Sequence, residues 1–303
     1  MKQFRKNIEN LEPSKSMSAG IAQYDEDVLN LTMGVPILNK KIIIPEIETH
    51  NYLKSNGTKE GLKKISELFY DNRVNPDNLI ITSGAKHGIF TLLSVLNINK
   101  IANMTPSWLG YKALFELLDI DFIMFDKTSI ENIVAICKKE KVQALLIDNP
   151  SNPTSTVLTV GIIKRLSSEL KKNGCLLIID EVYKKLTFSN EYKTDLLIDE
   201  NIIRVGSLSK AYGAPGLRIG YIQSENTELI SKLEIFIQHS SSCIPEICIK
   251  ILLAITKKQF NHYILESNNV YNKRFNKLYD LLNNLGYDVE KAESGFYLFF
   301  KTK

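Results

Sequence analysis

The sequence has no dense basic segment and no long apolar run. Its 38 Lys and Arg residues and 34 Asp and Glu residues are spread along the chain and leave a net charge of +4. Nucleic-acid-binding surfaces need clustered basic side chains, so nucleic acid is a poor candidate partner. No stretch approaches the roughly 20 apolar residues of a membrane span, and the charged residues 1–12 lack the apolar core of a signal peptide. We therefore expect no membrane contact and a cytoplasmic location.

Cysteine and histidine are scarce and scattered. The cysteines form no CxxC pair and show no zinc-finger spacing, which indicates buried thiols in a reducing compartment. The histidines lack paired spacing, so the sequence gives no support for a metal site. The residues concerned are Cys137, Cys175, Cys243, Cys248, His50, His87, His239 and His262.

From about residue 78 the chain alternates short apolar runs with segments of helical spacing. The apolar runs are 79–82, 101–105, 122–125, 144–148, 176–179, 202–205 and 219–222. Strands that are apolar on both faces indicate a mostly parallel sheet covered by helices. After residue 221 the pattern is helical until a last predicted strand at 296–300. A chain of 303 residues is long enough for one large and one smaller domain.

Ligands of such sheets bind beyond the carboxyl ends of the strands, so the residues that follow strands are the first candidates. The segment 206–213 (GSLSKAYG) directly follows one predicted strand. Its Lys210 amine suits an imine with a carbonyl-bearing, phosphorylated cofactor, and Arg218, with nearby serines, suits the phosphate. The alternative is a solvated lysine in a Ser/Gly loop.

Asp180 directly follows the predicted strand at 176–179. A buried carboxylate is costly unless a cation meets it, and a protonated pyridine nitrogen is such a cation. Tyr183 follows closely enough to place its hydroxyl near an oxygen on the same ring. The alternative for Asp180 is a cap of the next helix.

Three weaker segments also follow predicted strands. The turn 148–154 (DNPSNPT) offers the Asn152 amide to a phenolate-type oxygen, although by itself it is only a turn. The turn 82–86 (TSGAK) offers backbone N–H groups and a helix N-terminus to an anion. Trp108, the only tryptophan, can stack on a planar ring, although core packing is its usual role.

Taken together and in this order, these segments resemble fold type I pyridoxal-phosphate enzymes, specifically the class I and II aminotransferases that include aspartate aminotransferase. The resemblance implies a three-layer α/β/α fold with a mostly parallel seven-stranded sheet and a reduced small α+β domain. The expected divisions are an N-terminal segment at 1–45, a large cofactor-binding domain at 46–265 and a small domain at 266–303.

The resemblance also assigns residues to pyridoxal 5′-phosphate. It implies that Lys210 carries the cofactor as a Schiff base, that Asp180 pairs with the pyridine nitrogen, and that Trp108 stacks on the ring. Tyr183 and Asn152 are implied to bond the ring oxygen. The implied phosphate cradle consists of Ser83, Gly84, Ala85, Lys86, Ser207, Ser209 and Arg218.

Upstream, Tyr52 resembles the family's tyrosine that reaches the phosphate of the neighbouring subunit, which implies a homodimer with shared sites. Lys15 and Gly34 match the segment that lines the substrate side. The chain is shorter than the family pattern between Gly34 and Tyr52.

The family's arginine that clamps the substrate carboxylate lies beyond the strand matching residues 295–300, and no arginine here falls in its motif. We therefore expect weak activity on alanine, glutamate and aspartate, and better activity on a larger substrate that is gripped elsewhere.

Three functions remain open from the sequence. The first is an aminotransferase that uses an amino acid or amine and a keto acid. The second keeps the cofactor but eliminates, decarboxylates or oxidises the substrate, because the same chemistry of the cofactor serves all of these reactions. The third is a cofactor-binding or regulatory protein without turnover, although retention of both Lys210 and Asp180 argues against it.

Overall fold

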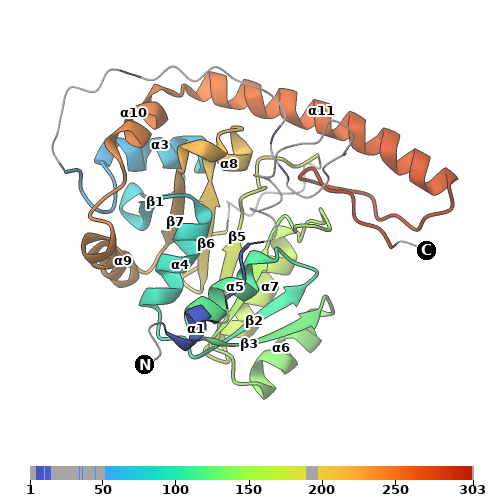
Figure 1. Ribbon diagram of the computed structural model, residues 1–303, viewed down its shortest axis with the longest axis horizontal. Coiled ribbons are helices and arrows are strands. Elements are labelled where there is room, and N and C mark those ends of the chain that lie inside the picture. Colours follow the sequence, from blue (N-terminus) through green and yellow to red (C-terminus); the bar gives the residue numbers. More distant parts are fainter. Residues whose placement is uncertain are drawn as a thin grey trace.

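The computed structural model describes residues 5–9, 11–14, 34, 36, 45, 52–188 and 197–301. A seven-stranded sheet with the order β1-β7-β6-β5-β4-β2-β3 forms its centre (Figure 1). The strands are β1 (Leu79–Thr82), β2 (Lys100–Thr105), β3 (Asp121–Asp126), β4 (Ala144–Asp148), β5 (Leu176–Asp180), β6 (Ile202–Ser207) and β7 (Gly220–Ser224). Each of the seven predicted apolar runs is therefore a strand. The sheet is parallel except for β7, which runs antiparallel to both of its neighbours.

Helices connect the strands, and polar side chains begin several of them. Thr58, Ser129 and Thr159 each accept a hydrogen bond from a backbone N–H of the first turn, which satisfies one of the free donors there. The helices are α1 (Lys6–Glu9), α3 (Lys59–Tyr70), α4 (Ala85–Val95), α5 (Gly110–Leu117), α6 (Ile130–Lys139), α7 (Val160–Lys171), α8 (Leu208–Ala211), α9 (Thr227–Ser240), α10 (Glu246–Ala254) and α11 (Lys257–Asn284). Two single 3-10 turns lie at Pro76–Asn78 and Pro215–Leu217.

The helices cover both faces of the sheet, so the fold has three layers. Successive strand residues point to opposite faces, and in β1 Ile80 packs with α4, α5 and α9 while Leu79 and Ile81 pack with α3, α10 and α11. Helices α6 and α7 cover β2, β4 and β5 on the face that α3 shares. Strands that are buried on both sides explain the continuous apolar runs of the sequence.

The strand predicted at residues 296–300 is absent. Phe300 makes one isolated bridge with Val289, and the other isolated bridge in the described residues joins Thr187 to Ser294. A strand needs a continuous partner, whereas here the aromatic rings of Phe296 and Tyr297 pack against each other and against Tyr183 and Tyr271. The apolar run therefore marks a packed loop.

The described residues contain neither a membrane-spanning helix nor a group of metal-binding side chains. Within the ranges given above, no helix combines the length and apolarity needed to cross a bilayer. In the same ranges, no three His, Cys, Asp or Glu side chains gather in a way that would hold a metal ion.

Because β7 is antiparallel, its first residues lie at the same edge of the sheet as the last residues of β1 and β6. Gly220, the first residue of β7, pairs with both Thr82 at the end of β1 and Ser207 at the end of β6. Consequently the residues just before β7 lie beside those that follow β1 and β6.

Candidate active site

Lys210 lies in the short helix α8, directly after β6, at the carboxyl edge of the sheet. Its Nζ donates a hydrogen bond to the backbone oxygen of Gly34 at 2.5 Å and lies 5.4 Å from the ring centroid of Phe296. Burial, with a smaller contribution from the positive charge of Arg218, lowers the pKa of Lys210 to about 8. A neutral amine is a nucleophile, so the site favours the reactive form.

Arg218 lies at the same edge, because it precedes β7. It adopts a left-handed backbone conformation (φ 51°), and its guanidinium donates to the backbone oxygens of Pro215 at 2.9 Å and Ser83 at 3.2 Å. Gly84 and Gly220 make this approach possible. A Cβ on Gly84 would lie 2.2 Å from Arg218 Nη2, and one on Gly220 would lie 2.5 Å from the carbonyl carbon of Gly84.

The turn at residues 83–86 adds further positive potential. Helix α4 begins at Ala85 and no side chain caps it, so its first backbone N–H groups lack intrahelical partners. Burial, together with the charge of Arg218, lowers the pKa of Lys86, whose Nζ lies 5.0 Å from the ring centroid of Trp108. The helix end, the guanidinium and the ammonium together form a site for an anionic group.

Asp180 ends β5 and is only 5% exposed. Its Oδ2 accepts a hydrogen bond from the Tyr111 hydroxyl at 2.9 Å, and its Oδ1 accepts one from the backbone N–H of Val182 at 3.1 Å. Burial raises the pKa of the carboxyl group to about 6. At neutral pH it is mostly ionised, and among the described residues no lysine or arginine forms an ion pair with it.

Asp148 is the neighbour of Asp180 in the sheet, where the two residues are register partners. Burial, opposed by the hydrogen bond from the backbone N–H of Asn152 at 2.8 Å, raises the pKa of Asp148 to about 7. The negative charge of Asp180 adds to that rise. Two adjacent carboxyl groups, with Asp180 buried and Asp148 half-buried, favour a cationic ligand at this edge.

Aromatic side chains cover Lys210 on the side of the C-terminal segment. The rings of Tyr183 and Phe296 lie 5.3 Å apart, and those of Phe296 and Tyr297 lie 5.4 Å apart. Tyr297 also accepts a hydrogen bond from the backbone N–H of Gly34 at 2.8 Å. The C-terminal segment that follows α11 thus returns to the carboxyl ends of the strands (Figure 1).

The structure brings most of the predicted residues to this one edge. Trp108 stands edge-on to Tyr111, with ring centroids 5.2 Å apart, and Asn152 bonds Asp148. The remaining predicted residues at this edge, by position in the turn after β1 or in the segment from the end of β6, are Ser83, Gly84, Ala85, Lys86, Ser207 and Ser209. Lys15 lies outside the described residues.

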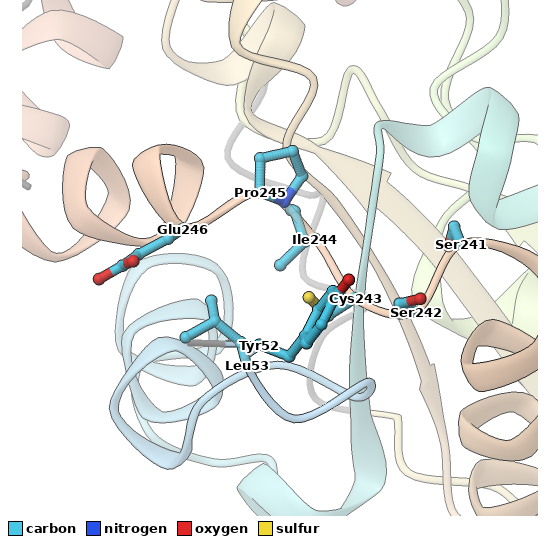
Figure 2. A pocket seen from close by; sticks show the side chains of 8 residues that line it. All are labelled: Tyr52, Leu53, Ser241, Ser242, Cys243, Ile244, Pro245 and Glu246. Atoms are coloured by element: carbon cyan, nitrogen blue, oxygen red, sulfur yellow. The ribbon is translucent and has the colours of Figure 1, made fainter. Parts of the chain in front are cut away.

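Tyr52 lies elsewhere. It is 87% exposed and lines a surface pocket of about 460 Å³ together with Leu53 and residues 241–246 (Figure 2). Of the predicted site residues, only Tyr52 lines this pocket. The pocket is therefore separate from the edge that carries Lys210.

Sequence reasoning missed three side chains. Tyr111 and Tyr297 lie in apolar sequence patterns, in which a tyrosine indicates core packing. The neighbouring sequence does not identify the hydrogen-bond partners of their hydroxyl groups. In the sequence Asp148 stands out only as the first residue of a turn, although it ends a strand as Asp180 does. That shared position was the available signal.

Chemically, the edge offers an amine, a buried carboxylate and an anion cradle. This combination suits a ligand with a carbonyl group, a ring cation and a phosphate. The cradle depends on Gly84, because a Cβ at this position would collide with the Arg218 guanidinium and keep it away from the turn.

Comparison with known proteins agrees with this chemistry. The family described as aminotransferase class I and II matches residues 28–303. The aspartate aminotransferase of Thermotoga maritima is 25% identical, over 98% of this chain and 85% of that protein. The (5-formylfuran-3-yl)methyl phosphate transaminase of Methanocaldococcus jannaschii is 28% identical, over 90% of this chain and 76% of that protein.

A solved structure supports the fold. The aspartate aminotransferase of Thermus thermophilus, in a structure with maleate, superposes with a TM-score of 0.85 over 100% of this chain and 86% of that chain, at 20% identity. At that identity the similarity concerns the fold alone, and it confirms the predicted three-layer architecture.

Proposed function

Because the chain belongs to the class I and II aminotransferases, a pyridoxal-phosphate-dependent family, we propose that it binds pyridoxal 5′-phosphate at Lys210 and transfers an amino group from an amino acid to a keto acid. The observation that carries the proposal is the meeting of Lys210, Asp180 and the Arg218 cradle at one edge of the sheet. The relatives reported above are transaminases, so the alternative reactions gain no support from them.

When bound, pyridoxal 5′-phosphate supplies an aldehyde that joins covalently to an amine and a ring that takes up the electron pair released at the substrate Cα. Lys210 presents the amine. With a pKa of about 8, about a quarter of its amine is neutral at pH 7.5, compared with about 0.1% for an ordinary lysine. With its amine free beside the bound substrate, Lys210 would serve as the base that moves a proton from the substrate Cα.

Asp180 holds the ring nitrogen in its protonated form. The carboxylate is buried and mostly ionised at neutral pH. A cation beside it would compensate for the hydration that the charge loses on burial. Val182 N–H and the Tyr111 hydroxyl fix its two oxygens. Tyr183 and Asn152 are the proposed donors to the ring oxygen, and Trp108 is the proposed stacking partner.

The phosphate is held by the turn at residues 83–86, by the α4 N-terminus and by Arg218, with Ser207 and Ser209 beside them. In the proposed division of the chain, residues 46–265 carry all of these groups. Residues 266–303 contribute Phe296, whose ring lies near Lys210, and the adjoining Tyr297. Helix α11 crosses the boundary between the two parts.

The reaction itself is tested by an amino-donor screen. Purified protein saturated with pyridoxal 5′-phosphate is mixed with each amino acid, and loss of the absorbance band of the bound cofactor is followed. We expect at least one donor to bleach the band and a keto acid to restore it. A band that no amino acid bleaches would contradict the proposed reaction.

Tyr111→Phe should weaken cofactor binding most at low pH. The Tyr111 hydroxyl favours the ionised form of Asp180, so its loss raises the pKa of Asp180 above about 6. Compared with the wild type, the variant then has a smaller ionised fraction of Asp180 at pH 6, whereas at pH 8 the fraction changes less. We expect the dissociation constant of the cofactor to rise about tenfold at pH 6, the scale of one charged hydrogen bond, and clearly less at pH 8. Fluorescence titration at both pH values measures this, with Tyr279→Phe on α11 as control. Equal losses at both pH values would contradict the assigned role.

We also propose a homodimer in which Tyr52 of each chain reaches the phosphate held by Arg218 of the other. Tyr52 is exposed and separate from the site of its own chain, which suits a residue that serves a partner. Light scattering should give twice the chain mass of 34.4 kDa. Tyr52→Phe should raise the dissociation constant of the cofactor about tenfold without dissociating the dimer. A fully active monomer would contradict this assignment.

A further inference from the structure

Glu181 follows Asp180 directly, and its side chain points to the opposite face of the sheet. Asp180 bonds Tyr111, which belongs to the core on the α4 and α5 side, whereas Glu181 bonds Tyr70 and Tyr221, which belong to the core on the α3 side. This alternation follows from the pleat of the strand. A second buried carboxylate therefore lies immediately behind the proposed site.

Three donors converge on one oxygen of Glu181. Its Oε1 accepts hydrogen bonds from the Tyr70 hydroxyl at 2.7 Å, the Tyr221 hydroxyl at 2.9 Å and Lys184 Nζ at 2.9 Å. The other oxygen lies 3.7 Å from Arg204 Nε in an ion pair. The side chains of Glu181, Lys184 and Arg204 are at most 3% exposed, so this group of five residues, the Glu181 cluster, is shielded from solvent.

The electrostatics of the cluster keep Glu181 ionised. Burial alone would raise the pKa of the carboxyl group, but the charges of Lys184 and Arg204 and the bond from Tyr70 outweigh it and hold the pKa below its usual value. Lys184 Nζ also lies 3.7 Å from the ring centroid of Tyr70. A fixed negative charge thus persists behind Asp180, where it adds to the rise in the pKa of Asp180.

The cluster joins the strands that carry the proposed site. Arg204 belongs to β6, Tyr221 to β7 and Tyr70 to α3, while the backbone N–H of Glu181 donates to the Val205 oxygen at 2.8 Å and extends the β5–β6 pairing. The Tyr221 hydroxyl also fills the space beside Gly206, where a Cβ would lie 2.3 Å from it. Gly206 leads directly into Ser207 and α8, so the cluster borders the path of the chain to Lys210.

We propose that Glu181 is a positioning residue, which holds the ends of β5, β6 and β7 in register and so fixes Asp180 and Lys210 relative to each other. The inference rests on the proposed function for its consequence in catalysis, but its structural part concerns the protein without cofactor. Glu181 itself touches neither the substrate nor the cofactor.

The test uses Glu181→Gln and the double variant Glu181→Gln/Lys184→Met. The double variant removes one charge of each sign and so leaves the net charge of the cluster unchanged. Arg204 loses its ion pair but keeps its hydrogen bonds to Gln223 Oε1 and the Leu197 backbone oxygen. The matched control is Glu140→Gln/Lys100→Met, which removes an ion pair of 2.8 Å on the β2 side of the sheet. All variants are studied at temperatures at which circular dichroism shows them to be folded.

In the protein without cofactor, hydrogen exchange at the amides of Glu181, Val182 and Leu208 should be about tenfold faster in the double variant than in the wild type, because local opening becomes easier. With pyridoxal 5′-phosphate, the dissociation constant should rise about tenfold, on the scale of other supporting contacts. The midpoint pH of the cofactor absorbance should shift, and kcat should fall about tenfold with KM nearly unchanged. The control should match the wild type in every measurement.

A merely structural role predicts something different. It would lower Tm while leaving the exchange rates at these amides, the midpoint pH and the cofactor affinity of the folded variant within about twofold of the wild type. That result would overturn the proposal. If the wild type itself binds no cofactor, the proposed function fails, and the exchange experiment alone decides whether Glu181 holds the strand ends.

Discussion

Replacing Lys210 by alanine should abolish covalent attachment of pyridoxal 5′-phosphate and lower amino-group transfer by about four orders of magnitude, the scale of losing a catalytic nucleophile. The Lys210 amine lies at the carboxyl edge of the sheet, and burial together with Arg218 lowers its pKa to about 8. The wild-type protein should be yellow with the cofactor bound. Borohydride reduction followed by peptide mass mapping should place the label on Lys210.

Lys232→Ala provides the control, since Lys232 is exposed on α9. It should keep both the label and the full rate. A colourless wild-type protein, or label on another lysine after cofactor addition, would mean that the amine has been misassigned.

Asp180→Ala should still bind the cofactor but lose about two to three orders of magnitude of turnover, the scale of removing one preorganised electrostatic partner. Without the carboxylate, nothing in the described site holds the ring nitrogen protonated, so the ring takes up the substrate electron pair poorly. Single-turnover kinetics with a saturating amino donor measures this loss. Asp148→Asn, its register partner, should lose far less, and normal turnover in Asp180→Ala would mean that the ring lies elsewhere.

Removing the Asp180 charge should have a favourable effect on the stability of the protein without cofactor. The folded pKa of Asp180, about 6, lies above the unfolded value of about 3.9. The folded state therefore binds the proton more tightly, and stability falls as pH rises from about 4 through about 6. Asp180→Asn should consequently show a higher Tm than the wild type at pH 8, and little difference at pH 4.

The sheet was predictable because its strands are buried on both faces, which leaves uninterrupted apolar runs such as those at residues 144–148 and 176–179. The direction of β7 was not, because an antiparallel strand in the middle of such a sheet is as apolar as its parallel neighbours. The false strand at 296–300 shows a similar limit of the apolar pattern, which does not reveal what a run packs against. An aromatic run satisfies the strand pattern whether its rings face a sheet or, as here, Tyr183 and Tyr271.

The candidate site was predictable where chemistry coincides with strand ends. Lys210 and Asp180 stand out because a charged side chain at the carboxyl end of an apolar strand, or a few residues beyond it, is costly to bury without a partner. Tyr111 and Tyr221 have no such signal in the sequence. Their hydroxyl partners, Asp180 and Glu181, lie far away in the sequence and are set only by the way that helices and strands pack.

β1 gains its partner only when the last strand of the sheet joins. Ile80 lies opposite Ile222, and within the described residues β7 is the only strand that pairs with β1. The chain between β1 and β7 spans residues 83–219. Closing this long loop costs chain entropy before the strand contacts form, so we expect this pairing among the slow steps of folding. The proposed phosphate cradle is built from the turn after β1 and the arginine before β7. If it binds the cofactor as proposed, a nascent chain would capture the cofactor only after that loop has closed. A ligand that spans the cradle then favours the closed sheet by mass action.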